Sequence, residues 1–161
     1  MRPISPVEAA LIFALGGAAL AVFVPTFIKN VHASRLVEPL DGLARIAGRA
    51  AQLADASPQA AAYPESAPLT PSNVPRGELV RDPAGTWSHP TWRLLDFAFG
   101  APHAYGFELA SKNAPELSSY TATARGDLDG DGVLSRCEVS GSVKPGAAPQ
   151  TLPLEVVREI E

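Results

Sequence analysis

The sequence TATARGDLDGDGVLSRCEVSGSV, residues 121–143, places two short runs of strand-forming residues on either side of a turn rich in aspartate and glycine. Thr121–Ala124 precedes the turn and Val139–Val143 follows it, and both segments have the residue types of short strands bounded by turn residues. We therefore expect a strand, a loop and a second strand, rather than a loop between two helices.

The loop itself has the pattern of a twelve-residue calcium loop from Asp127 to Glu138. Gly132 would provide the sharp turn at the sixth position. The oxygen ligands would come from Asp127, Asp129, Asp131, the Val133 carbonyl, Ser135 and Glu138. Hard oxygen ligands and several negative charges suit Ca²⁺, with an affinity at the weak, extracellular end of the scale, about 10⁻⁴ to 10⁻³ M. The alternative is a solvated Asp-Gly hairpin turn that holds no metal.

Two further patterns upstream indicate a β-rich globular region over residues 87–161. Tyr105–Leu109 alternates in the manner of a strand, as does Tyr120–Ala124. A dense aromatic patch covers Trp87–Phe97, and Trp87 and Trp92 fit a small hydrophobic core better than a surface that stacks sugars or bases.

The N-terminal region is dominated by AALIFALGGAALAVFVPTFI, residues 9–28, a run of twenty residues without a charge. As a helix this run would be about 30 Å long, enough for the core of a bilayer, so it predicts a transmembrane segment. A cleaved secretory signal is the alternative. Ser5, Pro6 and Glu8 form a capping box that predicts a helix start at Pro6.

Beyond this run, apolar residues continue at helical spacing with charged residues between them. The apolar positions are Leu36, Leu40, Leu43, Ala47, Ala50 and Ala54. The sequence thus predicts one helix over residues 1–56, first hydrophobic and then amphipathic. Residues 57–86 contain six prolines and predict a connecting loop.

Composition excludes several classes of function. The net charge of −4 without a basic stripe argues against nucleic acid as a partner. The lone Cys137 excludes an internal disulfide and a cysteine-based zinc site, and the three scattered histidines predict packing or surface roles rather than a transition-metal site. We find no nucleophile elbow and no phosphate-binding glycine loop, so we do not expect an enzyme.

The N-terminal region resembles type IV pilins and pseudopilins. The family's glutamate, mid-helix glycine and helix proline correspond to Glu8, Gly17 and Pro25, and Ile4 would then be the first mature residue. The W-x-x-P-T-W segment from Trp87 and the aspartate loop are similar to heads of pilin-like proteins. The resemblance implies an α+β fold in which a long N-terminal transmembrane and amphipathic helix packs on a small antiparallel β-sheet.

The resemblance also implies a function. The chain would be a minor pilin or pseudopilin of a type IV pilus or a type II secretion pseudopilus, assembling through its N-terminal helix with other such subunits and with inner-membrane assembly machinery and lipid. It would cross the inner membrane once, with a cytoplasmic N-terminus and a periplasmic or extracellular head. The alternative is a stand-alone, membrane-anchored calcium-binding sensor or adhesion module, in which Glu8 is only a helix-capping acid.

Overall fold

The computed structural model describes the backbone of residues 6–56 and 61–158. Within residues 8–35, it describes side chains only at Phe13, Ala14, Ala18 and Ala21. The chain divides after Leu36 into two compact units, and each is described by itself.

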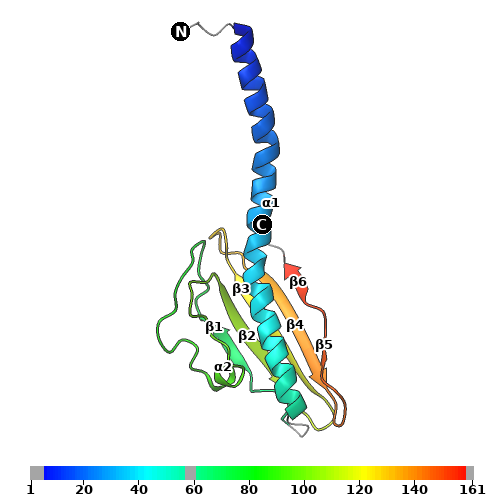
Figure 1. The fold of residues 1–161 in the computed structure, drawn as a ribbon. Helices are drawn as coiled ribbons and strands as arrows, with labels where there is room; N and C mark the ends of the chain where they lie inside the picture. The colour runs from blue at the N-terminus through cyan, green and yellow to red at the C-terminus, as the bar shows by residue number, and fades with distance from the viewer. Residues whose placement is uncertain (1–5, 57–60, 159–161) are drawn as a thin grey trace. The chain divides into compact units, whose positions relative to one another are not determined.

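Helix α1 runs over Pro6–Ala56 and contributes its residues up to Leu36 to the first unit and Val37–Ala56 to the second (Figure 1). Its first residue is the one that the capping box predicts. Glu8, Gly17 and Pro25 all lie within α1, but their side chains are outside the described residues.

No helix in the described part of the chain combines the length and the apolarity that crossing a membrane requires. The predicted transmembrane segment at residues 9–28 is therefore wrong, and with it the transmembrane helix of the expected fold and the single-pass location in the inner membrane. A run without charges is necessary for a membrane span but not sufficient.

The second unit is built mainly from an antiparallel sheet. Its strands are β1 (Ala67–Thr70), β2 (Tyr105–Lys112), β3 (Ser118–Gly126), β4 (Ser135–Val143), β5 (Gln150–Thr151) and β6 (Glu155–Arg158). The order is β1-β2-β3-β4-β5, and β6 also pairs with β4 (Figure 1). The strands predicted within β2, β3 and β4 are confirmed, whereas β1 lies unpredicted in the proline-rich connection.

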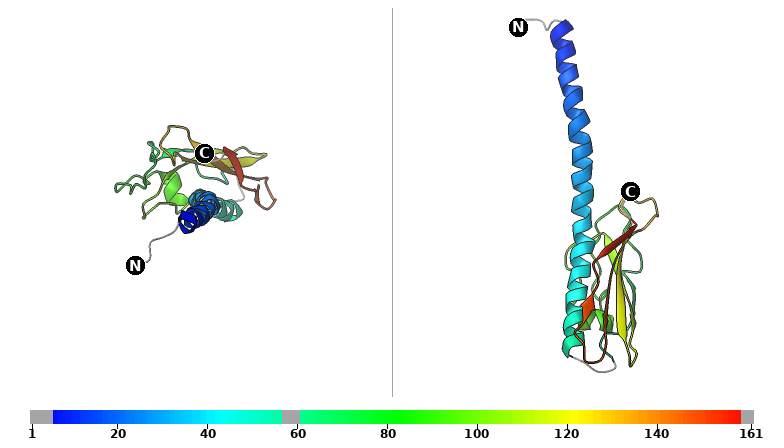
Figure 2. Two further views of the ribbon diagram at one scale, coloured as in Figure 1. Left: turned by 90° about the horizontal axis from the view of Figure 1, so that it is seen from above. Right: turned by 90° about the vertical axis from the view of Figure 1, so that its right-hand side faces the viewer.

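One face of this sheet packs against the Val37–Ala56 part of α1, as Figure 2 shows from the side. Alternate residues of the central strands supply the buried face of the sheet. They are Phe107, Leu109, Ala122, Ala124, Cys137 and Val139, and α1 adds Leu43, Ile46, Ala47, Ala50 and Ala54. The amphipathic spacing of the helix is thereby explained, because its apolar stripe covers the sheet.

An aromatic cluster closes the edge of this core beside helix α2, Pro90–Leu94. Trp92 is fully buried, and its Nε1 donates to the Thr70 hydroxyl at 2.9 Å. The ring of Trp87 lies 5.6 Å from that of Trp92 and 5.4 Å from that of Phe97, centroid to centroid. The predicted core role of the tryptophans is confirmed, although the aromatic patch contains a short helix.

Glu38 joins α1 to the start of β2 by hydrogen bonds. Its Oε1 accepts the backbone N–H of Ala104 at 3.0 Å and that of Tyr105 at 2.9 Å. Desolvation raises the pKa of Glu38, while these two N–H groups and the charge of nearby His103 lower it in part. The carboxylate is thus used as an acceptor for two buried backbone donors at the cost of its own hydration.

We predict that Glu38→Ala destabilises the chain by about 2 to 3 kcal/mol, because it leaves two buried N–H groups without an acceptor. Glu38→Gln keeps an acceptor and should cost less. Since the native pKa lies above the usual 4.5, the wild type should lose part of its stability as the pH rises from 4.5 to the native pKa, and the Gln variant should not. Urea denaturation of the full chain between about pH 4 and 7 measures both effects. Equal costs for the two variants would contradict the assigned role.

Candidate functional site

The aspartate loop, residues 127–134, connects β3 to β4 at one end of the sheet. Gly126 and Ser135 are the last paired residues of the two strands, and the Ser135 hydroxyl donates to the Gly126 carbonyl at 3.0 Å. The expected strand, loop and strand arrangement is therefore present, and the pairing of β3 with β4 fixes where the loop begins and ends.

The carboxylates of Asp127, Asp129 and Asp131 converge within this loop. Each offers an oxygen that lies within 4.8 Å of the corresponding oxygens of the other two. Asp127 is almost fully buried at 1% exposure, whereas Asp129 and Asp131 are exposed. The cluster thus has a fixed buried member and two members open to solvent.

Asp127 organises the loop through both of its carboxylate oxygens. Oδ1 accepts the N–H of Gly130 at 2.9 Å, and Oδ2 accepts that of Gly132 at 3.1 Å. Both glycines have positive φ, 80° and 90°, a region that side chains with a Cβ rarely adopt. The loop therefore curls around the Asp127 carboxylate, which explains why glycine occupies both positions.

The carboxylates of the two exposed aspartates, Asp129 and Asp131, each accept a backbone N–H two residues farther along the chain. Asp129 Oδ1 accepts the N–H of Asp131 at 3.2 Å, and Asp131 Oδ1 accepts that of Val133 at 2.6 Å. These side-chain-to-backbone bonds span two residues, as in Asx turns. Each bond uses one oxygen of its carboxylate.

The connecting loop supports the aspartate loop from outside. The N–H of Gly77 donates to the Asp127 carbonyl at 2.7 Å, and Arg76 Nε lies 3.9 Å from Asp127 Oδ2. The Arg76 side chain is 76% exposed, so its ion pair contributes little on its own. Sequence reasoning missed this contact, since nothing in the spacing links residue 76 to residue 127.

Two of the remaining predicted ligands are engaged on the sheet. The carboxylate of Glu138 accepts hydrogen bonds from Thr123 and Arg136 and is not part of the aspartate cluster. The Ser135 hydroxyl donates to the Gly126 carbonyl, and the role of the Val133 carbonyl stays a prediction. Because β4 is extended from Ser135 onward, Ser135 and Glu138 project to opposite faces of the sheet and cannot both turn toward the loop.

A second polar cluster is buried within the unit. His103 Nε2 lies 2.7 Å from Asp82 Oδ2, and His103 Nδ1 lies 2.8 Å from the Tyr105 carbonyl. Trp87 Nε1 donates to the same Asp82 oxygen at 2.6 Å. The imidazole thus contacts Asp82 through one nitrogen and the Tyr105 carbonyl through the other, and it ties the connecting loop to β2. The packing role expected of His103 is confirmed, and His89 caps α2.

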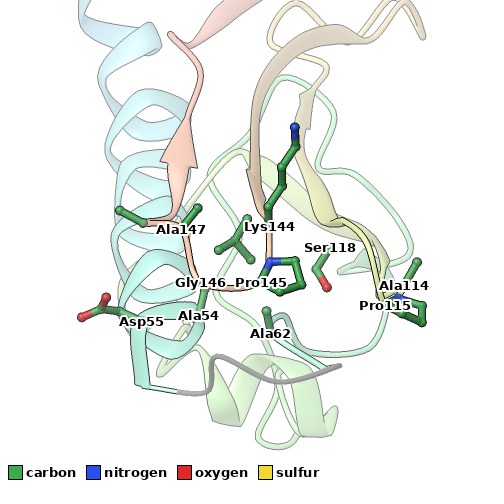
Figure 3. A pocket seen from close by; sticks show the side chains of 12 residues that line it. Ala54, Asp55, Ala62, Ala114, Pro115, Ser118, Lys144, Pro145, Gly146 and Ala147 are labelled. Carbon is green, nitrogen blue, oxygen red and sulfur yellow. The ribbon is translucent and has the colours of Figure 1, made fainter.

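A hollow of about 540 Å³ lies at the C-terminal end of α1, between the turns that follow β2 and β4 (Figure 3). Alanine, proline and glycine make up most of its lining, with Asp55 and Lys144 as its charged members among the described residues. Figure 3 shows the Asp55 carboxylate directed away from the hollow. These residues form no pair of a nucleophile and a base.

Comparison with protein-family models, with curated proteins and with solved structures finds no match to this chain. A functional assignment therefore depends on the chain's own residues and their geometry.

Proposed function

We propose that this chain is a structural subunit of a filament of the type IV pilus or type II secretion pseudopilus class, assembled through the N-terminal part of α1 and stabilised by calcium at the aspartate loop. The register of Glu8, Gly17 and Pro25 in α1 supports the proposal, as does a sheet that packs on the later part of the same helix.

The observation that carries the proposal is the exposure of apolar side chains in the first unit. All six described side chains of this unit before residue 36 are apolar and exposed: Pro6, Val7, Phe13, Ala14, Ala18 and Ala21. Val7 is 77% exposed and Phe13 80% exposed. A helix that is apolar over much of its surface requires a partner that covers it. Further copies of the same helix, packed side by side in a filament, would provide that cover.

The second unit supplies the other property that a filament subunit requires, a head fixed to its helix. Phe107 and Leu109 bury their side chains beneath Val37–Ala56, and Glu38 adds hydrogen bonds to the start of β2. The apolar face of Val37–Ala56 is consequently buried against the sheet. Residues 6–36 belong to a separate compact unit and are left for assembly.

The aspartate loop has a donor set that suits Ca²⁺. Asp127, Asp129 and Asp131 offer carboxylate oxygens within 4.8 Å of one another, and Ca²⁺ prefers oxygen ligands of this kind. A bound Ca²⁺ would offset most of the negative charge of three carboxylates that otherwise repel one another. We infer that these three residues hold the ion and that Glu138, which is engaged by Arg136, does not.

We predict that Phe13→Asp reduces the incorporation of the full chain into filaments at least tenfold, because it removes the burial of a large apolar side chain, worth about 1.5 to 3 kcal/mol, and adds a charge to the contact. Leu152→Asp is the matched control, since Leu152 is 62% exposed in the second unit. Electron microscopy and quantification of the tagged chain in sheared filaments measure incorporation. Normal incorporation of the Phe13 variant would exclude assembly through this helix.

We further predict that ~5 mM Ca²⁺ stabilises the full chain by about 1 kcal/mol and raises its thermal midpoint by a few degrees, whereas Mg²⁺ does less. Asp129→Asn and Asp131→Asn should abolish this rise without a large change in the calcium-free midpoint, since both side chains are exposed.

Two controls make the calcium assay specific. Asp41→Asn makes the same chemical change at an exposed aspartate on α1, and this variant should retain the full rise in thermal midpoint with Ca²⁺. Glu138→Gln should also retain this rise, because the Glu138 carboxylate accepts hydrogen bonds from Thr123 and Arg136 on the sheet. Calorimetry on the full chain that detects no heat of binding at millimolar Ca²⁺ would rule out the metal assignment.

A further inference from the structure

Arginines occupy directly opposed positions on three adjacent strands. Arg125 of β3 is the register partner of Arg136 of β4, and Arg136 is in turn the register partner of Arg158 of β6. Like charges directly opposite one another destabilise a sheet. The opposition of Arg125 and Arg136 therefore has a cost to folding, which their ion pairs with Glu108 and Glu138 offset.

The adjacent row of the same sheet carries the opposite charge. Glu108 is the register partner of Thr123, which is paired with Glu138, and Glu138 is paired with Glu155. Arg125 and Arg136 lie on the face that points away from α1, because their neighbours Ala124 and Cys137 fill the core. The outer face thus has Arg125 and Arg136 beside Glu108 and Glu138.

Each arginine is oriented by a single glutamate oxygen. Arg125 donates from Nε at 3.1 Å and from Nη2 at 2.6 Å to Glu108 Oε1. Arg136 donates from Nε at 2.8 Å and also from Nη2 to Glu138 Oε1. Among the described residues, the Nη1 group of neither arginine has a hydrogen-bond acceptor. Both guanidinium groups are thus held in place while part of their donor edge is available.

A hollow of about 480 Å³ lies beside these two arginines. Its lining consists of Arg125, Gly132, Val133, Leu134, Arg136 and Val157. Among the residues that the structure describes, no acidic side chain belongs to this lining. Val133 and Val157 are each 48% exposed and flank the arginines with apolar surface.

We propose that this hollow binds an acidic peptide segment of a partner protein, with one side-chain carboxylate between Arg125 and Arg136 and a neighbouring aliphatic side chain on Val133 and Val157. The planar guanidinium group matches a carboxylate through paired N–H donors. A carboxylate in the hollow would accept hydrogen bonds from the Nη1 groups of Arg125 and Arg136, which have no acceptor among the described residues.

The surrounding charges favour a carboxylate over a phosphate group. Glu108 and Glu138 already balance the charges of Arg125 and Arg136 one for one. A monoanion adds one negative charge to this neutral set, whereas a phosphate dianion adds two beside the glutamates. The apolar flanks fit a peptide with an aliphatic residue next to the acid. This site does not require the chain to form filaments.

The test measures binding of a fluorescein-labelled, end-blocked Val-Glu-Val peptide to the full chain by fluorescence anisotropy, with chelator present so that calcium has no part in the result. The matched peptide Val-Gln-Val differs only in the charge and should bind roughly tenfold more weakly. This comparison uses the wild-type chain alone, so it does not depend on any variant being folded. Equal binding of the two peptides would overturn the proposal.

Variants locate the site. Arg136→Gln should weaken binding of the Glu peptide roughly tenfold, and Arg136→Lys should restore part of it, because lysine retains the charge but not the paired donors. Arg93→Gln makes the same charge change at an exposed arginine on α2 and should leave binding unchanged. Unchanged binding to a folded Arg136→Gln chain would refute the site.

A competition experiment distinguishes a carboxylate from a phosphate group. If inorganic phosphate displaces the peptide more strongly than acetate does at equal ionic strength, the assignment to a carboxylate is refuted.

Discussion

Phe107 of β2 lies against Gly42 of α1 so closely that a Cβ atom on Gly42 would come within 2.5 Å of the ring. This approach sets the distance between the helix and the sheet, and it places Leu43 and Ile46 on either side of the contact, where both are fully buried. The Glu38 carboxylate lies one turn earlier on the helix and reaches the first residue of β2 only because the two elements are this close. Burial of apolar area and satisfaction of two backbone donors are consequently achieved by the same packing.

Packing of one face of the sheet leaves the other face to charged and hydroxyl side chains. Thr121 and Ser140 are hydrogen-bonded across β3 and β4, and the ion pairs of Arg125 and Arg136 lie farther along the same two strands. These partly exposed pairs add little to the free energy of folding. Their importance lies in geometry, because they fix the guanidinium groups beside the end of the aspartate loop.

The parts of the fold that could be predicted are those whose signal is local. The alternation in β2 and β3 predicts strands because one face is buried and the other is not, and the capping box predicts the first residue of α1. β1 lies among prolines and was missed, although an edge strand can accommodate Pro68. The prediction of Ser135 and Glu138 as metal ligands followed from loop spacing alone, and that spacing did not anticipate that β4 is already extended at Ser135. The transmembrane prediction followed from the missing charges of residues 9–28 alone, and no helix in the described part of the chain meets the requirements for crossing a membrane.

The aspartate loop connects these features through a few shared residues. Gly132 donates its N–H to the buried Asp127 carboxylate, and the same residue lines the hollow beside Arg125 and Arg136. Val133 donates to Asp131 and contributes apolar surface to that hollow. A change in the electrostatic repulsion among the three aspartates therefore acts on the backbone that forms one wall of the hollow.

The connecting loop also restrains the aspartate loop. The N–H of Gly77 donates to the Asp127 carbonyl, and this hydrogen bond limits how far the aspartate loop can move. Since these contacts leave the loop few alternative arrangements, charge neutralisation at the aspartates would change the stability of the wall more than its position.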